Sequence, residues 1–313
     1  LCCLTNGLGG RESMLKPQPC QGGRVLVIGG GPAGCESAIR LAQRGYSVTL
    51  WERSNKLGGQ LNLAAVCPAK GEFGTLLNYY AAELSALGVE VCLNREATPE
   101  SVRAAGFGRV VVANGGQPNP LKIPNAVTAE DILTGAVIPG KHVVVVGGSF
   151  KGVETARYIA RKSALSPEEL FFLVTQRAET PEQAARMADT SAREITLVEQ
   201  GKKIGLGYEP GVAWTVMQEL HRLHVHLKKN TLLNDRRAMD GTVLLETRDK
   251  EGNLTQKTIP CDTLVYAAGV HPDESLTQAL TALGIEAVSV GNCKQLGRAI
   301  GAISDAAALG CAF

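Results

Sequence analysis

Aromatic residues are scarce in this chain of 313 residues, at 4% of the sequence, and charges of the two signs nearly cancel to a net +2. No basic run or face stands out, which argues against nucleic-acid binding. No stretch reaches the roughly 18 consecutive apolar residues of a membrane-spanning helix, so no membrane partner is predicted. The N-terminus has neither a signal-peptide pattern nor an initiating Met, and we expect the chain to be a piece of something longer.

The nine cysteines are scattered, and no pair has the spacing C-x-x-C. Several fall inside predicted helices and strands, where a thiol acts as a small hydrophobic group. We therefore expect a reduced, cytoplasmic protein. His221, His224 and His226 fall where a helix is expected to give way to a strand, so we interpret them as surface or packing residues rather than as a metal site.

Glycine is abundant instead, with 36 residues, many of them in short clusters flanked by apolar residues. Residues 24–28 predict a buried strand, 29–34 a glycine turn, 35–44 a helix and 47–51 a second strand. Such a unit is typical of a nucleotide-binding α/β fold.

The same unit recurs later in the chain. Residues 141–146 predict a strand, 147–152 a turn, 153–162 a helix and 194–198 a strand. Between this helix and strand, the Pro-containing helix starts at Ser166 and Thr180 predict a helical insertion.

The repeat predicts an α/β fold with two Rossmann-like nucleotide-binding domains, the second inserted in the first. We expect residues 1–22 to be a tail or linker and residues 23–137 plus 271–313 to form the first domain. Residues 138–270 then form the second domain, with the helical insertion at 163–193.

The first turn carries the three glycines of a dinucleotide fingerprint. Gly29 permits the tight turn, Gly31 lets a pyrophosphate approach the backbone, and Gly34 lets the helix pack closely on the strand. Phosphates are favoured at the helix N-terminus by unpaired N–H groups. Glu52 ends the second strand, where an acid accepts hydrogen bonds from a ribose.

The second turn has Gly147 and Gly152 in place, but its middle position is Ser149, whose side chain would crowd the pyrophosphate or hydrogen-bond to it. Glu199 again ends the following strand. An acid there favours a free 2′-hydroxyl over a 2′-phosphate, so we expect NADH in preference to NADPH, although two lysines follow closely.

Two fingerprints suggest two cofactors rather than one. Hydride transfer between a nicotinamide and a flavin needs no nucleophile and no metal, only ring atoms held roughly 3–3.5 Å apart with water excluded. We accordingly assign no catalytic side chain.

The motifs together resemble the C-terminal module of the enoate reductase, 2,4-dienoyl-CoA reductase and trimethylamine dehydrogenase family, whose two domains are of the pyridine nucleotide-disulfide oxidoreductase type. The insertion is most similar to the 2-enoate reductase branch. The matching segments are 27–34, Glu52, 57–61, 111–115, 146–148, 198–199, 267–269 with Pro272, and 290–292.

The resemblance implies that the first domain binds FAD and the second a nicotinamide dinucleotide. Implied FAD-binding residues are Gly29, Gly31, Pro32, Ala33, Gly34, Glu52, Arg53, Gly59, Gln60, Ala113, Asn114, Gly115, Gly291 and Asn292. Implied residues for the nicotinamide nucleotide are Gly147, Gly148, Ser149, Gly152, Glu199 and Gly269. Asn292 stands where the family usually has Asp, which implies weaker FAD binding, and Asn114 replaces a usual Thr.

The family also implies partners for this module. Its members carry a flavin barrel with FMN and a [4Fe-4S] cluster, so electrons would pass from NADH through FAD to the cluster and FMN. Cys3 resembles the last of four cluster ligands, but one thiolate cannot hold a cluster, so we expect [4Fe-4S] and FMN only in a longer protein or a partner. The alternatives are a free-standing NADH:acceptor oxidoreductase and a nucleotide-binding structural domain without turnover.

Overall fold

The computed structural model describes residues 3–16, 22–120, 123, 125–239, 241–249, 251–267 and 269–313, with the backbone alone described over 235–239. Cys2, Cys20 and Ala268 lie outside these residues. The chain divides into two compact units. Unit 1 comprises residues 1–65, 70–118 and 270–313, and unit 2 comprises 66–69 and 119–269.

Unit 1 is built on a five-stranded parallel sheet with the order β15-β4-β1-β2-β3. Its strands are β1 (Arg24–Ile28), β2 (Ser47–Trp51), β3 (Glu90–Cys92), β4 (Arg109–Val112) and β15 (Glu286–Ser289). A separate antiparallel pair joins β5 (Gln117–Pro118) to β14 (Val270–His271).

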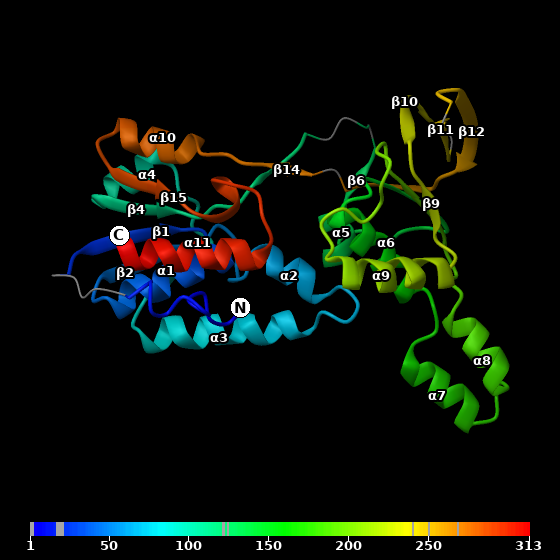
Figure 1. The fold of residues 1–313 in the computed structure, drawn as a ribbon, viewed down its shortest axis with the longest axis horizontal. Helices are drawn as coiled ribbons and strands as arrows, with labels where there is room; N and C mark the ends of the chain where they lie inside the picture. The colour runs from blue at the N-terminus through cyan, green and yellow to red at the C-terminus, as the bar shows by residue number, and fades with distance from the viewer. Residues whose placement is uncertain are drawn as a thin grey trace. The chain divides into compact units, whose positions relative to one another are not determined.

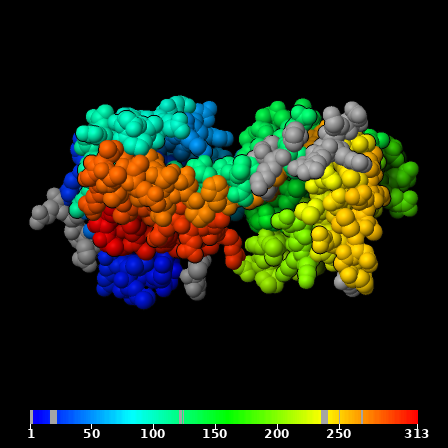
Figure 2. All heavy atoms as spheres, turned by 90° about the horizontal axis from the view of Figure 1, so that it is seen from above, coloured from blue at the N-terminus to red at the C-terminus, as the bar shows by residue number. Residues whose placement is uncertain are grey.

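Helices cover both faces of this sheet (Figure 1). One face packs against α1 (Pro32–Gln43), α3 (Glu72–Ala86) and α11 (Ala299–Ala312), and the other against α4 (Pro99–Ala104) and α10 (Ser275–Ala282). Short elements are α2 (Gln60–Ala65) and the 3-10 turn η1 (Gly291–Cys293). In Figure 2, α10 (orange) lies on the surface of unit 1.

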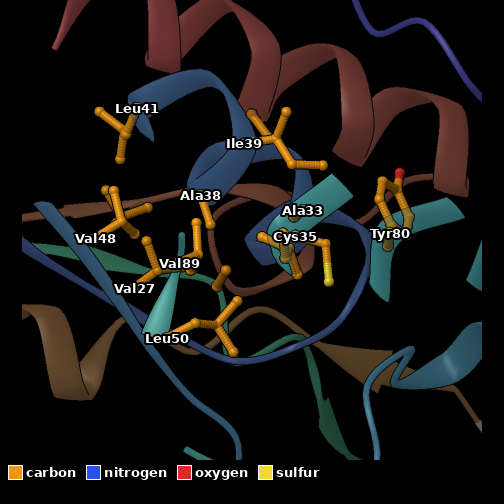
Figure 3. Close-up of a cluster of buried hydrophobic side chains, with 14 of the residues drawn as sticks. Val27, Ala33, Cys35, Ala38, Ile39, Leu41, Val48, Leu50, Tyr80 and Val89 are labelled. Atoms are coloured by element: carbon orange, nitrogen blue, oxygen red, sulfur yellow. The ribbon is translucent and has the colours of Figure 1, made fainter. Parts of the chain in front are cut away.

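Strand β1 is a continuous run of apolar residues after Arg24 because both faces of its sheet are covered by helices. Val27 and Leu50 point from the sheet towards Ala38 and Ile39 of α1, and all four side chains are buried (Figure 3). Helix α1 begins at Pro32, three residues before its expected start, because proline fits the first helical position without losing a hydrogen bond.

Unit 2 repeats the plan with a five-stranded parallel sheet of order β6-β13-β7-β8-β9. Its strands are β6 (Val127–Thr128), β7 (His142–Val146), β8 (Glu194–Val198), β9 (His226–Lys228) and β13 (Thr263–Tyr266). Its helices are α5 (Ala129–Thr134), α6 (Phe150–Lys162), α7 (Pro167–Thr175), α8 (Pro181–Ala188) and α9 (Pro210–Arg222).

An antiparallel sheet completes unit 2, with β10 (Thr231–Met239), β11 (Thr242–Arg248) and β12 (Leu254–Pro260) in that order. Its yellow strands form part of the outer surface of the unit in Figure 2. None of the helices in the described residues is long and apolar enough to cross a membrane.

Two features of this organisation differ from those expected, one domain boundary and the packing of the N-terminal segment. Residues 119–137, placed by the sequence in the first domain, belong to unit 2 because β6 pairs with β13 and α5 packs on α6. The expected tail is packed rather than free over residues 3–16. Leu8 is buried against Ala307, and the Arg11 guanidinium donates to the Ser304 carbonyl at 3.3 Å.

Candidate nucleotide-binding sites

The first glycine turn joins β1 to α1, and each glycine has its own structural reason. Gly29 has φ +104°, a conformation that favours glycine, and its N–H donates to the Trp51 carbonyl at 2.8 Å. A Cβ at Gly34 would lie 1.8 Å from the Gly29 carbonyl oxygen, so only glycine lets α1 start this close to β1. A Cβ at Gly31 would meet nothing within 4 Å, so the space before this residue is open.

Glu52 follows β2 and is held against this turn. It is buried, with 7% of its surface exposed. Its Oε2 accepts the Gly30 N–H at 2.6 Å, and its Oε1 accepts the N–H and the hydroxyl of Ser54, both at 2.7 Å. The carboxylate is therefore fixed at the turn, whereas the neighbouring Arg53 is exposed.

Residues from distant parts of unit 1 also meet this turn. Gly59 lies close enough that its Cβ would be 3.2 Å from the Gly31 Cα, and Gln60 follows it at the start of α2. The Gly291 N–H donates to Asp305 at 3.0 Å, and a Cβ at Gly291 would be 2.9 Å from that of Ala33. The fold thus brings residues near positions 30, 59 and 291 to one place.

The loop after β4 reaches the same turn. The Ala113 N–H donates to the Ile28 carbonyl at 2.8 Å, and Gly115 has φ +79°. The Oδ1 of Asn114 is buried and makes no hydrogen bond within the described residues. An unsatisfied buried acceptor is costly and favours a donor supplied by a ligand. Asn292 differs, because its Oδ1 accepts the Gly297 N–H at 3.0 Å.

The second turn, between β7 and α6, reproduces these bonds in unit 2. Gly147 has φ +112°, and its N–H donates to the Val198 carbonyl at 2.9 Å. A Cβ at Gly152 would lie 1.7 Å from the Gly147 carbonyl oxygen. Glu199 accepts the N–H of Gly148 and that of Gly201, each at 2.6 Å. This arrangement matches that of Glu52.

Ser149 does not distort the second turn. It precedes α6 with φ −74° and ψ −179°, and Gly31 precedes α1 with φ −73° and ψ 179°. The Ser149 hydroxyl makes no capping hydrogen bond to its own helix. The two turns therefore have the same backbone conformation at this position, and what Ser149 adds there is its side chain.

Two other residues, Gly269 and Cys3, were predicted for the sites. Gly269 lies after β13, and its carbonyl accepts the Asn119 N–H at 3.0 Å. Cys3 is exposed, with its Sγ 3.1 Å from the Thr5 hydroxyl, and hydrogen bonds from Thr5 and Asn6 lower the pKa of its thiol. No group of three or more His, Cys, Asp or Glu side chains among the described residues is placed to hold a metal.

Sequence reasoning missed some residues that shape the two turns. The Phe150 ring lies 4.7 Å from that of Tyr208, whose hydroxyl donates to buried Glu154. Burial of the Tyr208 hydroxyl raises its pKa, and the nearby charge of Glu154 raises it further. Asp305 of α11 accepts the Gly291 N–H at 3.0 Å and lies 3.6 Å from the Lys294 ammonium. No local sequence pattern links these partners.

Comparison with known proteins identifies the family. A model described as pyridine nucleotide-disulphide oxidoreductase matches residues 23–293. The chain belongs to the pyridine nucleotide-disulphide oxidoreductase family. Its relatives include members of the enoate reductase, 2,4-dienoyl-CoA reductase and trimethylamine dehydrogenase family, to whose C-terminal part the chain corresponds, so the resemblance drawn from the motifs is confirmed.

Three relatives illustrate the match. A metal reductase from Desulforamulus reducens is 38% identical over 293 residues, which cover 89% of this chain and 42% of the relative. An NADH oxidase from Thermoanaerobacter brockii is 30% identical over 318 residues, covering 97% of this chain and 43% of the relative. A solved complex of 2-naphthoyl-CoA reductase has a TM-score of 0.82 and 28% identity, and covers 100% of this chain and 43% of that one. The chain spans less than half the length of these relatives.

Proposed function

We propose that this chain is a FAD-dependent NAD(P)H oxidoreductase module of the enoate reductase type. The turn of unit 1 holds FAD, and the turn of unit 2 holds NADH. Hydride passes from NADH to FAD, and electrons then pass to an iron-sulfur and FMN domain or subunit. The observation that carries this proposal is the duplicated turn, in which Glu52 and Glu199 each accept a turn N–H at 2.6 Å.

The residues of unit 1 fit a flavin dinucleotide. The open space before Gly31 admits a pyrophosphate to the N-terminus of α1, whose unpaired N–H groups and positive dipole end favour phosphate. Glu52 keeps lone pairs for the ribose hydroxyls while backbone donors fix its orientation. The unsatisfied Asn114 oxygen offers an acceptor to a ligand N–H or O–H. When bound, the flavin supplies the two-electron chemistry.

The residues of unit 2 fit a nicotinamide dinucleotide with a free 2′-hydroxyl. The Glu199 carboxylate is fixed by two N–H donors, so it cannot swing away from a 2′-phosphate without losing both. This rigidity supports a preference for NADH. Lys202 and Lys203 follow in the sequence and oppose the preference by their charge.

The proposal is tested by adding FAD to the purified chain, removing the excess, and measuring dye reduction with NADH and with NADPH. We expect retained flavin and faster turnover with NADH. A chain that takes up no FAD would contradict the assignment of the first turn. Retained flavin with no turnover would favour the structural-domain alternative, and rapid oxygen consumption without a partner would favour a free-standing NADH:acceptor oxidoreductase.

A further inference from the structure

Ser149 stands in the second turn at the place that a nucleotide phosphate would approach. It precedes α6 as Gly31 precedes α1, with the same extended backbone conformation. A Cβ at Gly31 would meet nothing within 4 Å, so this direction away from the backbone is open in the first turn. The Ser149 side chain leaves the backbone in the corresponding direction and is half-buried. A phosphate bound at the second turn therefore meets this side chain.

The Ser149 hydroxyl makes no hydrogen bond within the described part of the chain. The other Ser and Thr residues that precede helices in unit 2 behave differently. Each accepts the N–H of the residue three positions on, and these capping residues are Thr128, Ser166 and Thr180. A serine in front of a helix ordinarily caps it, because the first N–H groups of a helix have no partner within it. The hydroxyl of Ser149 is instead free to bind a ligand.

The first N–H of α6 is already bonded. Phe150 donates it to the Leu206 carbonyl at 3.0 Å, where residues 149 and 206 form a short parallel bridge. Unit 1 has Pro32 at this position, which has no N–H. Neither turn therefore offers a phosphate the N–H of its first helical residue. The second turn has a hydroxyl beside this position, which the first turn lacks.

The basic side chain in the first turn of α6 is also engaged. The Lys151 ammonium group pairs with the carboxylate of Glu130 in α5. An ammonium group paired in this way attracts a phosphate less strongly, because the carboxylate repels the phosphate. Of the side chains in residues 147–152, the Ser149 hydroxyl is thus the polar donor without a partner among the described residues.

We propose that the Ser149 hydroxyl donates a hydrogen bond to the pyrophosphate of the dinucleotide bound at the second turn. This inference rests on the proposed function, which assigns a nicotinamide dinucleotide to unit 2. The bond takes the place of the N–H that Phe150 gives to Leu206, and it offsets the crowding by the Ser149 Cβ. Hydrogen bonds to a charged acceptor are stronger than neutral ones. Ser149 therefore strengthens the binding of every ligand that carries the pyrophosphate, with or without a 2′-phosphate.

The first test is the variant Ser149→Ala, which removes the hydroxyl and keeps the Cβ. The FAD-loaded chain is titrated calorimetrically with NAD⁺, NADP⁺ and ADP-ribose, which carry the pyrophosphate and cannot give a hydride to the flavin. Each dissociation constant should rise at least about 10-fold and by the same factor. The ratio of the constants for NAD⁺ and NADP⁺ should stay unchanged, which separates this role from that of Glu199.

The opposite role for Ser149 gives the opposite result. A serine that only crowds the pyrophosphate is relieved by the smaller alanine side chain. A Ser149→Ala variant that binds ADP-ribose as tightly as the wild type, or more tightly, therefore overturns the proposal. A loss of affinity confined to one of the three ligands overturns it as well, because all three share the pyrophosphate.

Ser166→Ala is the matched control, because Ser166 also precedes a helix of unit 2 but caps it. Its hydroxyl accepts the Glu169 N–H at 3.1 Å. This variant should lower Tm and leave the dissociation constant for ADP-ribose unchanged. Ser149→Ala should do the reverse, with Tm of the nucleotide-free chain within about 2 °C of the wild type. If Ser149→Ala lowers Tm as much as Ser166→Ala does, its effect on binding is structural and the proposal is overturned.

The equivalent position of unit 1 gives a second test. Gly31→Ala and Gly31→Ser both add a Cβ where the pyrophosphate of FAD would approach, but only serine adds a hydroxyl. Gly31→Ser should bind FAD about 10-fold more tightly than Gly31→Ala. Equal affinities would show that a hydroxyl at this position makes no bond to a pyrophosphate and would overturn the proposal. A wild-type chain that binds none of NAD⁺, NADP⁺ and ADP-ribose is a distinct outcome, because it contradicts the proposed function itself and this inference with it.

Discussion

The two glycines that bracket the start of α1 should respond to alanine in different ways, Gly34 mainly through stability and Gly31 mainly through FAD affinity. At Gly34 an added Cβ would lie 1.8 Å from the Gly29 carbonyl oxygen, where real Cβ atoms do not approach within 3.0 Å. The obstacle is backbone, so the strand and helix must separate by about an ångström. Such overpacking costs about 3 kcal/mol, and the better helix propensity of alanine returns about 1 kcal/mol. Gly34→Ala should therefore cost about 2 kcal/mol and lower Tm by about 6 °C.

At Gly31 the same methyl group meets no protein atom within 4 Å, and φ is an ordinary −73°. Gly31→Ala should cost no more than about 1 kcal/mol, for its poorer helix capping. The methyl group stands where a pyrophosphate would approach, so the dissociation constant for FAD should rise about 10- to 100-fold. Thermal unfolding of the chain without FAD and fluorescence titration with FAD measure the two effects separately. The reasoning is refuted if Gly31→Ala destabilises as much as Gly34→Ala, or if it binds FAD like the wild type.

Three further predictions rest on other contacts. Glu199→Gln should reduce the preference for NADH over NADPH by about 10-fold, because one charge that repels a 2′-phosphate is lost. The ratio of the dissociation constants for NADH and NADPH measures this preference, and an unchanged ratio counts against the role of Glu199. Burial opposes the charge of Glu219, but two arginines, each 2.5 Å away, outweigh it and hold its pKa below the ordinary value. The stability contributed by the ionised Glu219 is fully present above the ordinary glutamate pKa, and it is lost as the pH falls through the lowered pKa of the folded state. Glu219→Gln should therefore cost about 2 kcal/mol at neutral pH and progressively less in acid. A difference in thermal unfolding between variant and wild type that does not change with pH would be inconsistent with this prediction. Arg95→Ala should cost about 1 kcal/mol in urea unfolding, because the guanidinium lies 3.7 Å from the centre of the Trp51 ring; no loss would exclude this cation–π contact.

Local signals in the sequence located both turns. The apolar strand before Gly29 and the acidic residue Glu52 belong to one strand–turn–helix–strand unit. In the structure the Glu52 carboxylate accepts the N–H of Gly30 in this turn. The same holds for Gly147 and Glu199. These features are predictable because glycine at positive φ and close helix packing leave few alternatives.

Features set by distant contacts were not predictable in this way. The boundary near residue 118 depends on the pairing of β6 with β13, which joins segments far apart in the sequence. Asp305 belongs to none of the sequence motifs, yet the fold brings its carboxylate to the Gly291 N–H. The segment 3–16 has no periodicity, and Leu8 is buried against Ala307 and Cys311 of α11. Tertiary packing, not local propensity, decides each case.

The central claim is that NADH bound to this chain reduces FAD bound to the same chain. The most direct measurement is the bleaching of bound flavin in an anaerobic stopped-flow experiment, with NADH and with NADH deuterated at the transferred C4 position. The account predicts complete bleaching that is slower with the deuterated nucleotide, because the C4–hydrogen bond breaks in the step observed. Flavin that stays oxidised while NADH is bound would contradict it.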